Sequence, residues 1–166
     1  DLGVHRVDLR DGSVTRIAER GNYFSLSPDG AQLFYSRPDN NVQTIWRRDL
    51  ASGVEQAIDR GPRPAMKVSP DGKFVAVYVL DRSGLAANAP TQTASIMVVP
   101  STGGERRPLV TGLHSTINTI TWSHDSQRVL FVKFVGGEPS QAYEVWSVPL
   151  TGGPPETLGI RAGWAK

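Results

Sequence analysis

The sequence contains no cysteine, and this absence removes several kinds of chemistry at once. Disulfides, thiolate zinc sites, iron–sulfur clusters and a cysteine nucleophile all require this residue. Because both reducing and oxidising compartments hold proteins without cysteine, the absence leaves the location open. The chain begins at Asp1 with neither a methionine nor an apolar leader. We therefore expect its natural N-terminus to lie outside this sequence.

Long apolar runs and a dominant charge are also lacking. The longest apolar run is Phe74–Leu80, which at seven residues is far short of the roughly 20 needed to cross a bilayer. We therefore expect no membrane insertion. The 18 basic and 16 acidic residues leave a net charge of only +2. The basic pairs Arg47–Arg48 and Arg106–Arg107 fall in predicted strands, where neighbouring side chains point to opposite faces, so we expect no nucleic-acid partner.

Glycine and proline, by contrast, are abundant, with 17 and 12 residues, and some of them form a repeat. Ser27-Pro28-Asp29-Gly30 recurs unchanged as Ser-Pro-Asp-Gly at positions 69–72. It recurs again in altered form as Ser-His-Asp-Ser at positions 123–126. In this motif proline presets φ, aspartate bonds to the nearby backbone and glycine accepts a positive φ. Each copy therefore predicts a tight turn between two extended segments.

A second turn, which ends in glycine, occurs four times: at Asp11-Gly12, Ser52-Gly53, Gly103-Gly104 and Gly152-Gly153. Apolar residues around both turns alternate with a period of two, which indicates strands, and no window has the period of a helix. The two turns join strands a to b and c to d of a four-stranded unit. The expected core consists of four repeated columns: Leu26/Val68/Trp122, Leu33/Val75/Val129, Tyr35/Val77/Phe131 and Trp46/Met97/Trp146.

A four-stranded antiparallel unit of about 40 to 50 residues, repeated in tandem, is typical of a β-propeller blade. At these turn and strand residues the chain resembles WD40-like β-propeller repeats of the Ser-Pro-Asp-Gly type. Repeats of this type occur in the TolB propeller and in the propeller domains of prolyl oligopeptidase-like peptidases. The third copy departs from the motif, with His124 in place of proline and Ser126 in place of glycine.

The predicted fold is all-β: one β-propeller segment with three complete four-stranded antiparallel blades and partial blades at both ends. Residues 4–18 supply strands c and d of a partial blade, 21–59, 63–110 and 115–159 are whole blades, and 161–166 begin the next blade. We expect the chain to be part of a larger propeller. A compact four-bladed ring and a ring closed between two chains are the alternatives, and a homo-oligomer could form through the incomplete end blades.

Loop lengths distinguish the two faces of the predicted propeller. The stretch from the aspartate of the first turn to the last glycine of the second is shortest in the first whole blade, at 29–53. It is longer in the third blade, at 125–153, and longest in the second, at 71–104. Because the turns keep a constant length, the extra residues fall in the b–c loops. The longest of these loops is 81–90, in the second blade. The d–a loops on the same face vary too. Loops that vary on a rigid scaffold commonly carry function, so this loop face is the predicted binding surface.

The candidate binding residues lie in or beside these variable loops. Their aromatic, guanidinium and imidazole groups suit a peptide or an anionic ligand. They are Asn22, Tyr23, Arg37, Arg60, Arg63, Asp81, Arg82 and His114.

No catalytic residues, cofactor or metal site are predicted. The three histidines belong to different blade positions, and the recurring aspartates Asp29, Asp71 and Asp125 occur once per blade as turn formers. The sequence has no Gly-x-Ser-x-Gly, Walker or Gly-x-Gly-x-x-Gly motif.

The prediction for function is a non-catalytic propeller scaffold that binds a protein or peptide partner, as the resemblance to TolB-type propellers implies. The alternative is a substrate-gating propeller domain of a prolyl oligopeptidase-like serine peptidase whose catalytic domain lies outside this chain. Only the family resemblance bears on location, and it favours a bacterial periplasmic or extracytoplasmic protein.

Overall fold

The computed structural model describes residues 3–19, 21–61, 65–81, 93–114, 119–135 and 142–163. In these ranges all regular secondary structure is β-strand. The strands are β1 (Val4–Val7), β2 (Val14–Ala18), β3 (Asn22–Leu26), β4 (Gln32–Asp39), β5 (Val42–Asp49), β6 (Glu55–Arg60), β7 (Ala65–Val68), β8 (Phe74–Asp81), β9 (Thr93–Pro100), β10 (Arg107–His114), β11 (Ile120–Trp122), β12 (Arg128–Phe134), β13 (Ala142–Pro149) and β14 (Glu156–Gly163).

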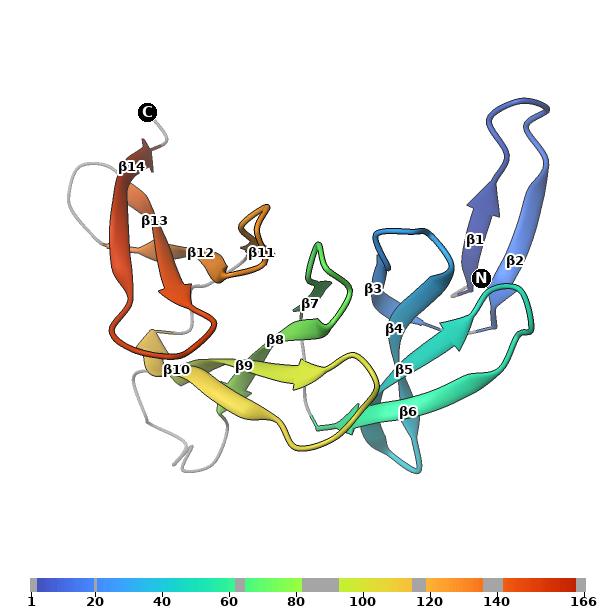
Figure 1. Cartoon of the computed structure of the whole chain (residues 1–166), viewed down its shortest axis with the longest axis horizontal. Helices are drawn as coiled ribbons and strands as arrows, with labels where there is room; N and C mark the ends of the chain where they lie inside the picture. The colour runs from blue at the N-terminus through green and yellow to red at the C-terminus, as the bar shows by residue number, and fades with distance from the viewer. Residues whose placement is uncertain are drawn as a thin grey trace.

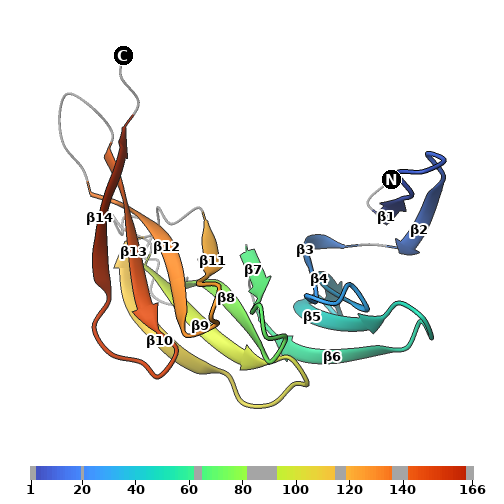
Figure 2. The same cartoon turned by 45° about the horizontal axis from the view of Figure 1, so that its top comes forward.

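The strands form four antiparallel sheets in which each strand pairs only with its neighbours along the chain. We call β1–β2 the half blade, and β3–β6, β7–β10 and β11–β14 the first, second and third blades. The prediction of three four-stranded blades and a two-stranded partial blade is therefore confirmed. The sheets follow one another along an open arc, with β3, β7 and β11 on its concave side (Figures 1 and 2). Contacts of β7 with both β3 and β11 join the three blades there.

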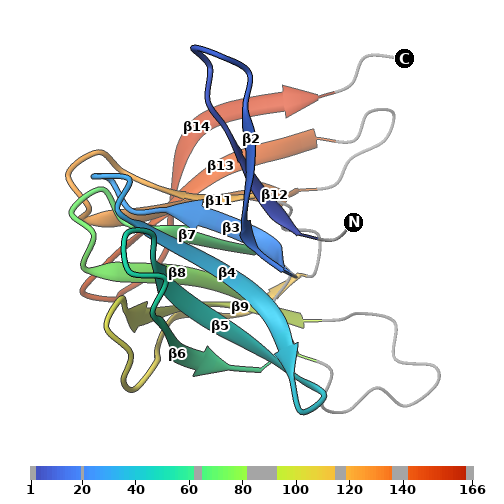
Figure 3. The same cartoon turned by 90° about the vertical axis from the view of Figure 1, so that its right-hand side faces the viewer.

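The repeated tetrapeptides form the predicted turns. In the first copy Gly30 has a φ of 70°, and its N–H donates to the carbonyl oxygen of Ser27 at 2.9 Å. The Asp29 carboxylate accepts the Ser27 hydroxyl at 2.5 Å and the N–H of Ala31 at 3.0 Å. These turns lie on the same side of the arc as the c–d turns, whereas the β4–β5 connection lies on the opposite side (Figure 3).

The altered third copy keeps the turn, with serine in the left-handed conformation. Ser126 has a φ of 61°, close to the φ of 73° at its counterpart Gly72. Its hydroxyl oxygen accepts the backbone N–H of Asp71 at 2.9 Å. A serine is strained at this positive φ, whereas glycine is not, but the serine adds a hydrogen bond between the second and third blades.

Apolar side chains fill the junctions between the whole blades. The first and second blades meet through side chains such as Phe34 and Ile45 on one sheet and Val75 and Val77 on the other. A larger cluster joins the second and third blades and includes Ile96, Val98, Val129 and Phe131. The columns Leu33/Val75/Val129 and Tyr35/Val77/Phe131 are fully buried, as predicted.

Two predicted core columns differ from the structure. Leu26 is 51% exposed, although its counterparts Val68 and Trp122 are buried. Leu26 lies on the same face of its sheet as Leu33, which packs against the half blade. The described half blade has only two strands, and neither of them is an inner strand that would cover Leu26. The column of Trp46, Met97 and Trp146 is only partly buried.

The strands β6, β10 and β14 run beyond the predicted ends of their blades at residues 59, 110 and 159. Residues 161–163, predicted to begin a further blade, pair with β13 as the end of β14. Residues 164–166 lie outside the described residues.

Candidate functional site

The described members of the predicted binding set lie toward strand ends on the loop face and come from two blades. Asn22 and Tyr23 begin β3, Arg37 is in β4 and Arg60 ends β6. Asp81 and His114 end β8 and β10, where both are backbone partners of Thr93. Arg63 and Arg82 lie outside the described residues.

Arg60 and Arg37 face different partners within the first blade. The guanidinium of Arg60 forms an ion pair with Asp39 at 3.0 Å, and its side chain is 59% exposed. An exposed pair of this kind contributes little to stability. Arg37 instead points along the sheet into a network of polar side chains.

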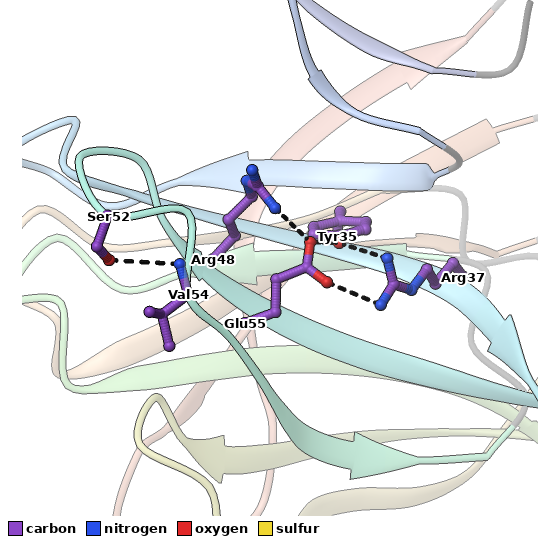
Figure 4. A network of polar contacts seen from close by, with 6 residues as sticks. All are labelled: Tyr35, Arg37, Arg48, Ser52, Val54 and Glu55. Carbon is purple, nitrogen blue, oxygen red and sulfur yellow. Dashed lines mark hydrogen bonds and ion pairs between the residues drawn. The ribbon is translucent and has the colours of Figure 1, made fainter.

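The network has the carboxylate of Glu55 at its centre (Figure 4). Arg37 donates through Nη2 to Oε2 at 2.8 Å, and Arg48 donates through Nη1 to Oε1 at 2.8 Å. The hydroxyl of Tyr35 also donates to Oε1 and accepts Nη1 of Arg37 at 3.1 Å. One carboxylate therefore binds two guanidiniums and a phenol, which leaves the four side chains with a net charge of +1.

Alternation in the strands brings these side chains to one face. Tyr35 is opposite Trp46 in the β4–β5 ladder, and Arg48 is opposite Glu55 in the β5–β6 ladder. The β5–β6 turn fixes the start of β6, because Asp49 accepts the Ser52 N–H at 2.7 Å and Ser52 accepts the Val54 N–H at 3.3 Å (Figure 4).

Gly53 in the same turn has no side chain, so it leaves space for the guanidinium of Arg48. Its φ is 75°, and a Cβ there would lie 3.1 Å from Nη2 of Arg48. A side chain at this position would therefore be strained in its backbone and would crowd the guanidinium.

Aromatic rings fix the position of the Arg37 guanidinium. Its central carbon lies 4.4 Å from the centre of the Trp46 ring and 5.6 Å from that of Tyr35. Stacking of this kind holds a guanidinium in place while its edge keeps N–H donors available. Arg37 is therefore ordered by two rings and two hydrogen bonds.

The network fixes the protonation of its two acidic members. Burial by itself would raise the pKa of Glu55, but the hydrogen bonds from Tyr35 and Arg48 and the charge of Arg37 outweigh it, so the pKa is lowered. Burial raises the pKa of Tyr35, and the hydrogen bond to Glu55 and its negative charge raise it further. At neutral pH Glu55 is a carboxylate and Tyr35 a neutral donor.

The network borders a cavity of about 410 Å³ between the half blade and the first blade. The half blade contributes residues 16–19, which include Arg16 and Glu19, and the first blade contributes Arg37, Arg48 and Glu55. We call these lining residues, together with Tyr35 and Trp46, the polar junction. The volume is within the range of sites that bind small ligands.

The third blade has part of the same arrangement. Lys133 lies 4.7 Å from the centre of the Trp146 ring, as Arg37 lies over Trp46. The indole N–H of Trp146 donates to Glu144 at 2.9 Å, and Glu144 pairs with Arg161 at 3.2 Å. In the first blade Thr44 has the position of Glu144, and the buried indole N–H of Trp46 has no hydrogen-bond partner among the described residues.

Sequence reasoning identified Arg37 but missed its partners. Tyr35 was expected as a core residue, Arg48 as one of an ordinary basic pair, and Glu55 was not singled out. A usable signal was present, because Tyr35 and Arg37 share one face of a strand, as do Trp46 and Arg48. The β5–β6 register, which brings Glu55 opposite Arg48, was the missing information.

Neither a metal cluster nor a membrane-spanning helix is present in the described ranges. Within them no three histidine, aspartate or glutamate side chains lie close enough together to hold a metal ion. The same ranges contain no helix long and apolar enough to cross a membrane.

No protein-family model and no curated protein matches this sequence. Among solved structures, a protein described as TolB from Agrobacterium tumefaciens matches 97% of the chain with a TM-score of 0.74 and 21% identity. TolB from Acinetobacter baumannii matches 94% with a TM-score of 0.69 and 22% identity. The acylaminoacyl peptidase of Pyrococcus horikoshii matches 94% with a TM-score of 0.67 and 13% identity.

The chain spans only part of each of these proteins: 57% of the Agrobacterium protein, 37% of the Acinetobacter TolB and 27% of the peptidase. At these identities the likeness shows the fold. The chain therefore has the β-propeller fold seen in TolB and in the propeller domains of acylaminoacyl peptidases.

Proposed function

We propose that the chain is a non-catalytic β-propeller scaffold that binds a protein or peptide partner through its loop face. The observation that carries this proposal is the conformation of Tyr23. This residue is 52% exposed and has a φ of 49°. It lies at the loop-face end of β3, the innermost strand of the first blade.

The backbone around Tyr23 is held by the sheet. The β3–β4 register shifts between Asn22 and Phe24, so Tyr23 occupies a bulge, and the Ser36 hydroxyl donates to the Asn22 carbonyl at 3.0 Å. A non-glycine residue at positive φ is strained, and such strain is concentrated at functional positions. An exposed, pre-positioned tyrosine is also the kind of residue that dominates binding energy at interfaces. Together these features favour a binding surface at this end of β3.

Peptide display tests the proposal. A random peptide library is selected on the wild-type chain, and the enriched peptides are titrated against Tyr23→Ser and Val54→Ser. Val54 is a matched control because it is 66% exposed on a c–d turn of the opposite face. We expect Tyr23→Ser to weaken binding at least about tenfold, the lower end of the effect of an interface hot spot. Equal binding to Tyr23→Ser and wild type, or no enrichment, would contradict the proposal.

The second candidate is the substrate-gating propeller of a prolyl oligopeptidase-like serine peptidase. The structural likeness to an acylaminoacyl peptidase over 94% of the chain favours it. It requires a catalytic domain with a Gly-x-Ser-x-Gly motif in the same polypeptide. Sequencing the coding region on both sides of this segment decides between the candidates, since the scaffold proposal requires no such domain.

A second copy of the chain is the proposed partner of the two end sheets of the arc, the half blade and the third blade. Apolar side chains are exposed on both, for example Val7 at 53% and Ile160 at 57%. Proteins seldom leave such residues clustered in water. Sedimentation of the wild-type chain and of Ile160→Glu should show a dimer that the substitution weakens, and a monomeric wild type would contradict self-association.

A further inference from the structure

The polar junction has three arginines, Arg16, Arg37 and Arg48, but only two carboxylates, Glu19 and Glu55, so it keeps a net positive charge. An arginine has five N–H donors. Arg37 uses two of them, on Glu55 and Tyr35, and Arg48 uses one, on Glu55. Glu55 accepts from both guanidiniums but neutralises only one of them. A carboxylate from a ligand would balance the remaining positive charge and accept from the donors that Glu55 does not use.

The cavity gives such a carboxylate a place to bind. Its volume of about 410 Å³ is bordered by both guanidiniums and by Arg16 of the half blade. The side chains of Arg37 and Arg48 are 28% and 30% exposed, so they are reachable from solvent yet partly shielded from it. Ion pairs in such a setting are stronger than on an open surface.

The site is also ordered before any ligand binds. Arg37 is stacked on Trp46 and bonded to Tyr35 and Glu55, so little of its side-chain freedom remains to be lost on binding. At the equivalent positions the second blade has Val77, Val79, Met97 and Val99. Of these, Val77, Val79 and Val99 belong to the apolar cluster shared with the first blade. The propeller repeat therefore does not need arginines at these two positions for its fold.

We propose that the polar junction is a carboxylate-binding subsite for an acidic side chain or the C-terminus of a peptide partner. This inference deepens the proposed function by naming the chemistry of the partner, and it rests on that function for the source of the carboxylate. Its test uses small probes and needs no partner.

The test is a titration of the whole chain followed by NMR of its indole and arginine side-chain N–H signals. N-acetyl-aspartate amide presents a side-chain carboxylate, N-acetyl-alanine presents a C-terminal carboxylate, and N-acetyl-asparagine amide is the neutral control. We expect one or both acids to shift the signals of Trp46 and Arg48, with weaker binding at higher salt. The neutral control should leave these signals unshifted.

Neighbouring arginines provide a matched pair of variants. Arg48→Met should weaken binding about tenfold or more, as the loss of a charge-assisted hydrogen bond predicts. Arg47→Met should leave it unchanged, because Arg47 points to the opposite face and donates to Gln56 at 2.7 Å. Binding that survives Arg48→Met, or acids that shift no signal of the junction, would overturn the proposal.

Glu55→Gln should change the affinity for the acidic probes in the opposite direction to Arg48→Met. A network with a purely structural role would not produce this increase. Removing the resident carboxylate frees donors on both arginines, so the acidic probes should bind several-fold more tightly. Unchanged or weaker binding by this variant would overturn the proposal even if Arg48→Met does not fold. If the display-selected peptides bind Tyr23→Ser as tightly as wild type, the proposal of a loop-face scaffold fails while the subsite still stands on the acidic probes, so the two proposals fail separately.

Discussion

The junction between the half blade and the first blade differs sharply from the junction between the first and second blades. The first is polar and borders a cavity, with Arg37, Arg48 and Glu55 facing the half blade. The second is apolar, and the residue at the position of Arg48 is Val99, which has no exposed surface. The two sheets have the same strand order and equivalent ladders. The repeat thus determines the backbone of each blade. A few residues on the strand face that meets the neighbouring sheet determine whether a junction is polar or apolar.

The largest expected effect comes from exchanging the chemistry of the two junctions. Val99→Arg would place a guanidinium where Arg48 stands in the first blade, but with no carboxylate facing it. An unpaired buried charge should destabilise the chain by about 3 to 5 kcal/mol. Urea denaturation measures the loss, and Arg48→Val is the control, which should cost far less. A near-neutral Val99→Arg would show that this junction is not closed to water.

Glu55→Gln is expected to have the next largest effect, on the polar side of the comparison. It removes the negative charge shared by Arg37 and Arg48, replaces one accepting oxygen by an N–H donor and leaves two partly buried cations close together. Loss of hydrogen bonds to a charged group predicts destabilisation of about 1.5 to 3 kcal/mol at neutral pH. Thermal or urea unfolding measures it. A change no larger than that of an ordinary exposed ion pair would mean that the network is well hydrated and contributes little.

The pH dependence of that difference sharpens the comparison. The pKa of Glu55 is lower in the folded chain than its ordinary value, so its contribution is present above the unfolded value of about 4.3 and is lost as pH falls through the folded value. The stability gap between wild type and Glu55→Gln should therefore narrow below about pH 4. Other carboxylates titrate equally in both proteins. A gap that stays constant into strong acid would contradict the assigned charge state.

The smallest expected effect concerns the hydrogen bonds at the rim of an apolar junction. Ser126→Ala keeps the left-handed backbone and removes the acceptor for the Asp71 N–H, so it should cost about 1 kcal/mol. Ser126→Gly loses the same bond but relieves the backbone, and it should stay within about 1 kcal/mol of wild type. Urea midpoints of the two variants should therefore differ in favour of glycine. Because both variants lack the hydrogen bond, the reverse order would show that the left-handed backbone at this position is not strained.

The sequence by itself determined the repeat, the turns and the pairing of strands within each blade. These depend on local chemistry: Gly30 accepts a positive φ, Asp29 bonds within its own turn, and alternation tells which residues share a face. The same reasoning predicted that Val75, Val77, Val129 and Phe131 are core residues, and the structure confirms that they are buried.

Only the tertiary structure decided what each face meets. Leu26 and Val68 occupy the same repeat position, yet Leu26 is half exposed because only the outer strands of the half blade lie beside its sheet. The polar junction was equally hidden from the sequence, since Arg37 and Glu55 belong to different strands and meet at 2.8 Å only through two strand registers and a turn. Periodicity assigns side chains to a face, but the packing of one sheet against the next determines whether that face becomes core, surface or binding site.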